Sequence, residues 1–141
     1  MIIRNRMNYW LIKSEPTAYS IDKLKEDKQT FWSGVRNYAA RNNLKAMKKG
    51  DICLFYHSVV DPAVVGLAKV VKEAYQDPTT EETAWVAVDV AFVKKFKTPV
   101  TLPEIKQDKA LAKMDLIRLG RLSVQTVKKE EYDHILGLAG A

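Results

Sequence analysis

The densest group of residues that could bind a ligand lies between positions 32 and 38. The segment Trp32-Ser33-Gly34-Val35-Arg36-Asn37-Tyr38 places an indole, a guanidinium, an amide and a phenol within seven positions. Aromatic rings stack on nucleobases, and arginine and asparagine side chains hydrogen-bond to base edges. The alternative is that Trp32 and Tyr38 pack in the core, where such residues are mostly buried, and that Arg36 is a solvated charge. The segment therefore indicates a candidate base-binding site, with core packing as the alternative.

A second candidate is the pair His57-Ser58, which could supply a base and a nucleophile. Adjacent side chains on a strand point to opposite faces, so this pair cannot form a hydrogen-bonded dyad on a continuous strand. The alternative makes His57 a neutral core histidine and Ser58 a turn residue. The sequence also contains no Gly-x-Ser-x-Gly elbow, no phosphate-binding loop and no dinucleotide fingerprint. We therefore expect a binding protein and not an enzyme.

Metal and disulfide chemistry is restricted by the residue counts. Cys53 is the only cysteine, and His57 and His134 are the only histidines. No intramolecular disulfide can form, and a structural zinc site normally takes four Cys or His ligands at short spacing. A site for Mg²⁺ or Ca²⁺ built from carboxylates alone stays open. We expect no metal and no cofactor.

The net charge favours anionic partners. The chain has 23 Lys and Arg against 17 Asp and Glu, a formal net charge of +6 at pH 7, which is a tendency toward nucleic acid and equally a solubility feature. Arg121 and Ser123 could bring a guanidinium and a hydroxyl to the mouth of a strand, although a surface arginine and a turn serine explain them equally well. The lysine pairs at 48–49, 94–95 and 128–129 are better explained as scattered solvated faces than as one phosphate track.

The length and composition indicate one globular domain. The chain has 141 residues, 47% of them hydrophobic, which fits a single domain of ordinary size. The longest mostly apolar stretch, residues 84–93, is about half the length that spans a bilayer, and residues 1–7 lack the apolar segment of a secretory signal. We expect a frayed lead-in over residues 1–7, a domain over residues 8–138, a cytoplasmic location, no membrane association and a monomer.

The elements that must position the candidate residues are short strands and helices. The strands are expected over residues 9–12, 52–57, 64–74, 85–96 and 122–127. The helices are expected from Ser20 to about Gln29, from Asn37 to Lys49, from Pro103, over residues 110–119, and from Lys128 to Gly137. Ser20 and Asn37 have side chains that cap helices well. The apolar run over residues 52–57 is typical of a strand buried on both faces.

The order of these elements predicts an α+β fold with mostly antiparallel strands. Five short strands make a small sheet with two exposed edges, and closing the sheet into a barrel removes them. We therefore expect a small, mostly antiparallel β-barrel flanked by short helices.

Four motifs, in order along nearly the whole chain, resemble the successive signatures of the EVE domain family. They are Tyr9-Trp10-Leu11-Ile12-Lys13-Ser14-Glu15-Pro16, the segment 32–38 with Arg41-Asn42, Phe55-Tyr56-His57-Ser58, and Arg121-Leu122-Ser123-Val124-Gln125. The EVE domain is similar to PUA, ASCH and YTH domains, each a small β-barrel flanked by helices. The resemblance implies a PUA-like barrel that recognises a modified cytosine of DNA or RNA, such as 5-methyl- or 5-hydroxymethylcytosine, in a pocket.

The resemblance also implies a set of site residues. The positions that match the family's motifs are Lys13, Ser14, Glu15, Trp32, Arg36, Asn37, Tyr38, His57 and Ser58, with Arg121 and Ser123 as rim or wall. A base that is unpaired or extruded from a duplex would stack on Trp32 or Tyr38. Its Watson–Crick edge would be recognised by the side chains of Asn37, Ser14 and Ser58.

The charged residues of this set would have two roles. Glu15 could accept from the N4 amino group of cytosine, whereas Arg36 and Lys13 could hold the flanking phosphates. Two positions depart from the family pattern: Ala39 stands where Gln is common, and Thr126 where Pro is common. The missing Gln leaves the base preference open. The alternative function is a small-molecule-binding or protein-binding module that uses the same pocket without nucleic acid.

Overall fold

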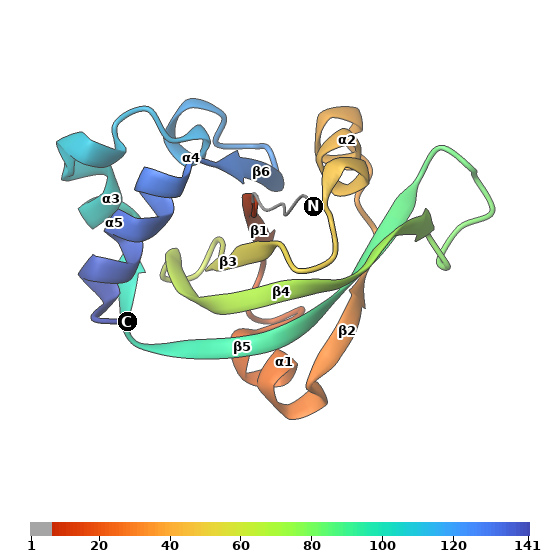
Figure 1. The fold of residues 1–141 in the computed structure, drawn as a ribbon, viewed down its shortest axis with the longest axis horizontal. Coiled ribbons are helices and arrows are strands. Elements are labelled where there is room, and N and C mark those ends of the chain that lie inside the picture. Colours follow the sequence, from red (N-terminus) through yellow and green to blue (C-terminus); the bar gives the residue numbers. More distant parts are fainter. Residues whose placement is uncertain (1–6) are drawn as a thin grey trace, which may run out of the picture.

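The computed structural model describes residues 7–141, which form one sheet with helices around it (Figure 1). The strands are β1 (Tyr9–Ser14), β2 (Gln29–Trp32), β3 (Ile52–His57), β4 (Ala63–Gln76), β5 (Val86–Thr101) and β6 (Val124–Val127). The helices are α1 (Ile21–Asp27), α2 (Tyr38–Ala46), α3 (Leu102–Gln107), α4 (Asp115–Arg118) and α5 (Lys129–Ala139), with a 3₁₀ turn at Lys109–Leu111. The lead-in expected over residues 1–7 lies, apart from Met7, outside the described residues.

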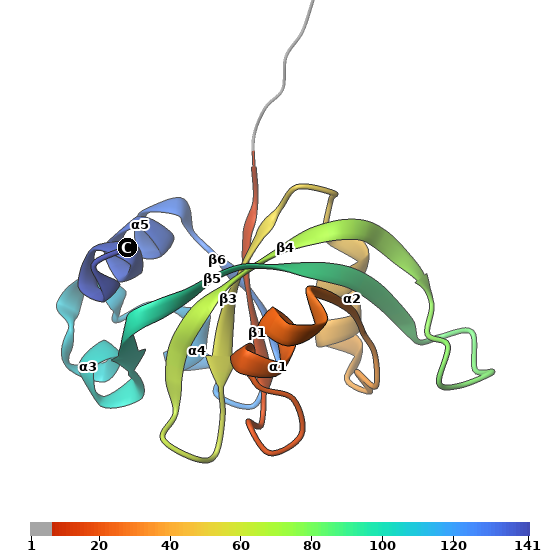
Figure 2. The same cartoon turned by 90° about the horizontal axis from the view of Figure 1, so that it is seen from below.

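The sheet has the strand order β2-β5-β4-β3-β1-β6. Its pairs are antiparallel except β1 with β3, which run parallel. The long strands β4 and β5 have several register shifts along their ladder, and such bulges increase the bend and twist of a sheet. Figure 2 shows the resulting curvature of β4 and β5 across the molecule. The expected α+β class with mostly antiparallel strands is confirmed.

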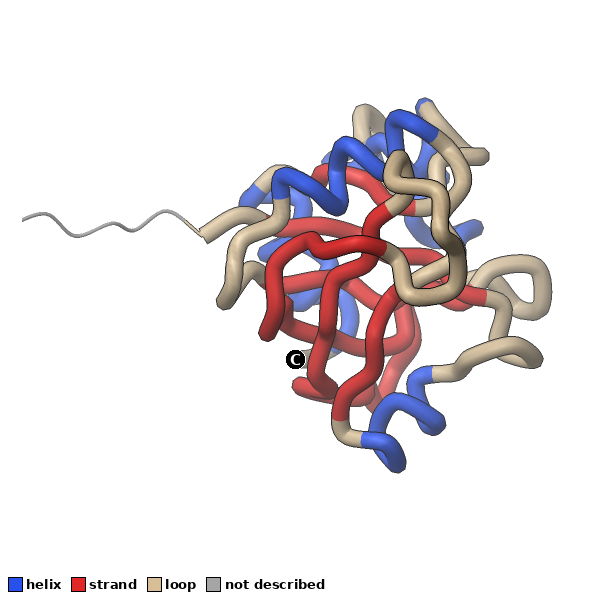
Figure 3. The backbone as a smooth tube through the Cα atoms, turned by 90° about the vertical axis from the view of Figure 1, so that its right-hand side faces the viewer, coloured by secondary structure: helices blue, strands red, loops and turns tan. Residues whose placement is uncertain are grey.

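The expected barrel is wrong, because the described sheet is open between β2 and β6. Both edge strands have only four residues, and α2 packs against β4, β5 and β6. Asn43 of α2 donates its Nδ2 hydrogen to the carbonyl oxygen of Val124 in β6, at 2.7 Å. A side chain of α2 therefore forms a hydrogen bond with the backbone of the edge strand β6. Figure 3 shows the helices as separate pieces around the strands.

The sequence also predicts five strands, whereas the described residues form six. The missed strand is β2, which directly follows α1 and pairs with β5 from Gln29 to Trp32. Its four residues are too short to show a clear alternation of polar and apolar side chains. The strand matters for function because it ends at Trp32, where the candidate motif begins.

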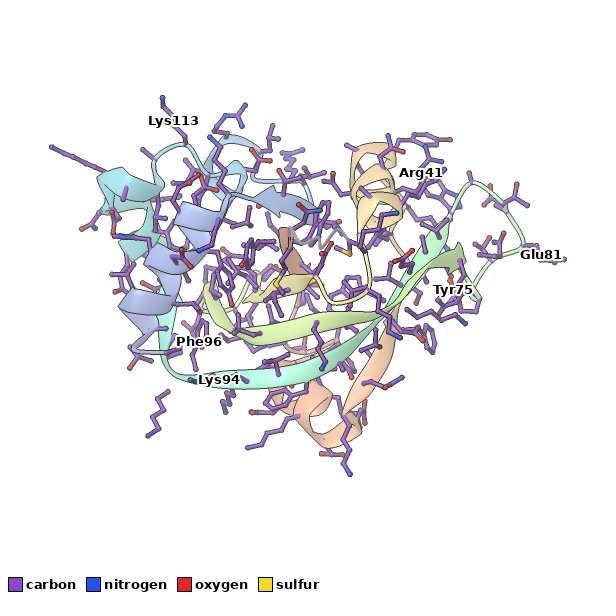
Figure 4. All side chains as sticks on the ribbon, viewed as in Figure 1. Arg41, Tyr75, Glu81, Lys94, Phe96 and Lys113 are labelled. Atoms are coloured by element: carbon purple, nitrogen blue, oxygen red, sulfur yellow. The ribbon has the colours of Figure 1, made fainter. Side chains whose placement is uncertain are left out.

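The core lies on both faces of the central strands. One cluster contains Trp10, Trp32 and Phe55, and the other contains Leu11, Leu54 and Phe96 beneath the C-terminal helices. Figure 4 shows Phe96 on β5 at the side where α5 lies. Residues 53–56 are all buried, so the expected burial of this strand on both faces is confirmed.

Candidate nucleic-acid interface

A hollow of about 380 Å³ lies where β1 and β2 end, between the two unpaired edges of the sheet. Its lining residues are Lys13, Ser14, Tyr19, Thr30, Phe31, Trp32, Ser33, Gly34, Val35, Arg36 and Ser123. Five of the residues expected at the site are among them: Lys13, Ser14, Trp32, Arg36 and Ser123. The volume falls in the range of small-ligand sites, about 300–1,000 Å³. The open edge of the sheet is thus the place where the motifs from distant parts of the chain meet.

The aromatic wall of the hollow comes from β2 and from the loop before α1. Trp32 is 9% exposed, and its ring makes edge-to-face contacts with Tyr19 at 6.2 Å and with Phe55 at 5.5 Å between ring centroids. Phe31 is 50% exposed and lines the same hollow. Trp32 therefore belongs both to the core and to the wall, and Phe31 offers the larger free aromatic surface. Neither Phe31 nor Tyr19 carries a sequence signal that separates it from ordinary apolar residues.

Arg36 is fixed by partners that lie far away in the sequence. Its Nη1 group donates to Asp77 Oδ2 at 3.0 Å, and its Nη2 group donates to Thr79 Oγ1 at 3.2 Å. Asp77 lies in the loop between β4 and β5, and its side chain is fully buried. The carboxylate also accepts from the backbone N–H groups of Gly34 at 2.8 Å and Thr79 at 2.7 Å. Arg36 is thus a paired cation that anchors the wall of the hollow.

The pKa of Asp77 reflects this set of bonds. Burial alone acts to raise it, but the hydrogen bonds from Thr79, Gly34 and Arg36 outweigh burial and lower the pKa to about 2. The carboxylate is therefore ionised at neutral pH and fastens residues 34–36 to the β4–β5 loop. The sequence shows Asp77 only as part of a polar loop next to a proline, so its role could not be predicted from the sequence.

Asn37 and Tyr38 lie outside the hollow. The Oδ1 atom of Asn37 accepts from the backbone N–H of Ala40 at 2.9 Å, which caps α2. Tyr38 is 61% exposed and stacks on Trp85, with ring centroids 4.9 Å apart. The guanidinium of Arg41 lies 5.0 Å from the Tyr38 ring and donates to the Ala84 carbonyl, toward the β4–β5 loop (Figure 4). The seven-residue motif is therefore split between the hollow and a separate aromatic surface.

His57 has a structural contact that explains its place in the motif. Its Nε2 atom accepts from the backbone N–H of Ile21 at 3.0 Å, at the first residue of α1. A neutral ring with its proton on Nδ1 satisfies this geometry. Burial lowers the pKa of His57, Lys95 acts in the same direction, and Asp22 acts against them. His57 thus holds the start of α1 beside the hollow.

Ser58 and Glu15 flank the hollow without lining it. The backbone N–H of Ser58 donates to the carbonyl oxygen of Ser14 at 3.0 Å, which places the β3–β4 loop beside the wall. The side chain of Glu15 is exposed, and its carbonyl oxygen accepts from the N–H groups of Ala18 and Tyr19. Both residues therefore shape the backbone at the rim.

Lys13 and Ser123 join the ends of β1 and β6 at the hollow. The N–H of Lys13 donates to the Ser123 carbonyl at 3.0 Å, and its Nζ donates to the Gly120 carbonyl at 2.6 Å. Burial lowers the pKa of Lys13. Arg121 is exposed and lines a different depression, together with Asn37. The hollow therefore has cations at its rim and the hydroxyls of Ser14, Thr30, Ser33 and Ser123 along its lining.

Residues 7–141 contain no group of three or more His, Cys, Asp or Glu side chains arranged to hold a metal ion. Within the same part of the chain, none of the helices combines the length and the apolar character needed to cross a membrane.

Comparisons with known proteins give a family match and several similar proteins and structures. The model of the EVE domain matches residues 8–138. Thymocyte nuclear protein 1 of Mus musculus is 43% identical, over 96% of this chain and 75% of its own length. The structure of a hypothetical protein from Leishmania major is 46% identical with a TM-score of 0.91, and 96% of each chain is covered. The human THYN1 protein in complex with 5-methylcytosine containing DNA is 38% identical with a TM-score of 0.87, over 95% of this chain and 98% of that chain.

Proposed function

The chain belongs to the EVE domain family, and from this premise we propose that it binds nucleic acid and holds a modified cytosine-type base in the hollow. The observation that carries the proposal is a hollow of about 380 Å³ that combines exposed aromatic surface with several hydroxyl groups. A base needs both, because its faces stack on rings and its edges form hydrogen bonds. The relative bound to 5-methylcytosine DNA supports the choice of base.

The residues of the hollow divide into three roles. Phe31 and Trp32 are adjacent on β2 and point to opposite faces of the strand, and we place the base on the ring of Phe31, which is the more exposed of the two. Ser14 and Ser123 supply hydroxyl groups for its edge, and Lys13 supplies a positive charge at the rim. A methyl group at position 5 adds about 1 kcal/mol when it is buried, which corresponds to roughly a fivefold preference. The predicted discrimination between methylated and unmethylated cytosine is therefore modest.

Three of the other expected site residues have structural roles in this proposal. Asn37 caps α2 and His57 holds the start of α1, while Arg36 anchors the wall through Asp77. We propose binding without catalysis, and the Nε2 atom of His57, which accepts from the backbone N–H of Ile21, is not free to act as a base. We propose residues 8–138 as the binding domain. The cytoplasmic location and the monomeric state stay predictions.

The test is a titration of the protein with labelled oligonucleotides, single- and double-stranded, DNA and RNA, with and without 5-methylcytosine. We expect the logarithm of affinity to fall linearly with the logarithm of salt concentration. Phe31→Ala should weaken binding by about tenfold, since stacking of one base on one ring is worth roughly 1–3 kcal/mol. Phe31 is half exposed, so the melting temperature should change little.

The matched control is Tyr38→Ala, which removes an exposed aromatic ring outside the hollow. Its affinity should stay within twofold of the wild type. The opposite result would be weaker oligonucleotide binding by Tyr38→Ala and wild-type affinity of Phe31→Ala. It would place the base outside the hollow and overturn the proposal. Binding that does not depend on salt would instead favour a partner without phosphates.

A further inference from the structure

The tip of the loop between β3 and β4 presents two adjacent apolar side chains to solvent. Val59 is 73% exposed and Val60 is 51% exposed. Single exposed apolar residues are common on protein surfaces. Two neighbouring valines at a loop tip form a small apolar protrusion, and its position relative to the hollow indicates what it contacts.

The backbone of this tip is held in an unfavourable conformation. Val59 has a φ of 71°, and the N–H of Val60 donates to the carbonyl oxygen of Ser58 at 2.9 Å. This bond spans three residues, as in a γ-turn with positive φ, which is a rare and strained turn. A β-branched residue disfavours positive φ further. Backbone strain of this kind clusters at binding sites, where the surrounding structure keeps it in place.

The contacts that keep the tip in place come from both ends of the loop. On one side the N–H of Ser58 donates to the Ser14 carbonyl at 3.0 Å. On the other side the Pro62 carbonyl accepts from the N–H of Leu102, the first residue of α3, at 2.9 Å. The valines therefore project from a loop that is fastened to two different elements.

The start of this loop is hydrogen-bonded to the lining of the hollow. Ser14 lines the hollow and pairs with His57 in the sheet, and Ser58 is hydrogen-bonded to Ser14. Val59 is the next residue, with its Cα about 3.8 Å from that of Ser58. Figure 2 shows the β3–β4 loop and the loop between β1 and α1 leaving the sheet at the same edge of the molecule. A double helix that delivers a base to the hollow would therefore meet the valines.

We propose that Val59 and Val60 form an apolar wedge that enters the base stack of a duplex when one of its bases occupies the hollow. This inference rests on the proposed function and adds that the protein binds double-stranded nucleic acid. Extrusion of a base leaves a gap between its neighbours and costs stacking energy. Proteins commonly fill such gaps with apolar side chains.

The experiment uses the double variant Val59→Gly with Val60→Ser. Glycine accepts a positive φ without strain, so the variant should melt at or above the wild-type temperature. Its affinity is measured for a duplex with one central 5-methylcytosine and for the single strand of the same sequence. We expect about a tenfold loss on the duplex, the effect of burying one valine side chain, and a change below twofold on the single strand. The matched control is Val93→Ser, an exposed valine of β5 that does not line the hollow.

A second measurement, the fluorescence of a base analogue, reports directly on base stacking in the duplex. A 2-aminopurine placed next to the 5-methylcytosine should become brighter when the wild type binds the duplex, and less so with the double variant. Equal losses on duplex and single strand, or wild-type affinity of the double variant for the duplex, would overturn the wedge and leave base binding intact. A wild type that binds neither oligonucleotide would overturn the wedge and the proposed function together. If the double variant does not fold, Val60→Ser alone serves in the same assays.

Discussion

Replacing Asp77 by asparagine should loosen the wall of the hollow and destabilise the fold. The fully buried carboxylate accepts hydrogen bonds from Arg36, Gly34 and Thr79. An asparagine keeps the shape but loses the charge, and its NH₂ group cannot accept from these donors. The Arg36 guanidinium is then left without its counter-ion. Because Gly34 and Arg36 line the hollow, we expect Asp77→Asn to weaken oligonucleotide binding as well.

The size of the effect follows from the pKa of Asp77. A decrease from the ordinary value of 3.8 to about 2 corresponds to about 2 kcal/mol of stability at neutral pH, at about 1.4 kcal/mol for each tenfold change in the acid constant. For a domain of this size, the melting temperature should fall by about 8 °C. The contribution is fully present above pH 3.8 and is lost as the pH falls toward 2, because the native carboxylate then takes up a proton.

The assay is thermal unfolding of wild type and Asp77→Asn at a series of pH values from 7 to about 3. The difference in melting temperature should be largest at neutral pH and shrink below pH 3.8. Asp133→Asn is the matched control, because Asp133 is 54% exposed and pairs with Lys129 on the surface of α5; such pairs contribute little. A difference that stays constant over the pH range, or equal melting at neutral pH, would refute the assigned role of the carboxylate.

Three further substitutions test the other contacts. Asn37→Ala should cost about 1 kcal/mol of stability through the lost helix cap and leave base preference unchanged; a changed preference in the titration would show that the amide contacts the base. His57→Ala should leave the N–H of Ile21 unpaired, at a cost of about 1 kcal/mol in urea unfolding. Because burial lowers the pKa of His57 below its ordinary 6.5, wild-type stability should decrease as the pH falls through 6.5, and this component should be missing from the variant. Gly66→Ala would place a Cβ against the carbonyl oxygen of Lys94, and a loss below about 1 kcal/mol in thermal unfolding would contradict this close approach.

The sequence predicts features that depend on near neighbours. The caps at Ser20 and Asn37 are confirmed by bonds to N–H groups three residues on, since a capping side chain reaches only the first turn of its own helix. The burial of residues 53–56 follows from an unbroken apolar run. The four motifs likewise indicate the family, because they are continuous segments of the chain. None of these inferences needs the position of a distant residue.

Only the tertiary structure decides how the motif between residues 32 and 38 is divided. Arg36 forms an ion pair with Asp77, and the ring of Tyr38 stacks on Trp85. Both partners lie more than forty positions away in the chain, and the long β4–β5 hairpin brings them there. The opening of the sheet between β2 and β6, where the hollow forms, depends in the same way on the pairing of strands that are distant in the sequence. Local composition and spacing contain no information on such pairings, because sheet register and helix packing select them from many chemically equivalent partners.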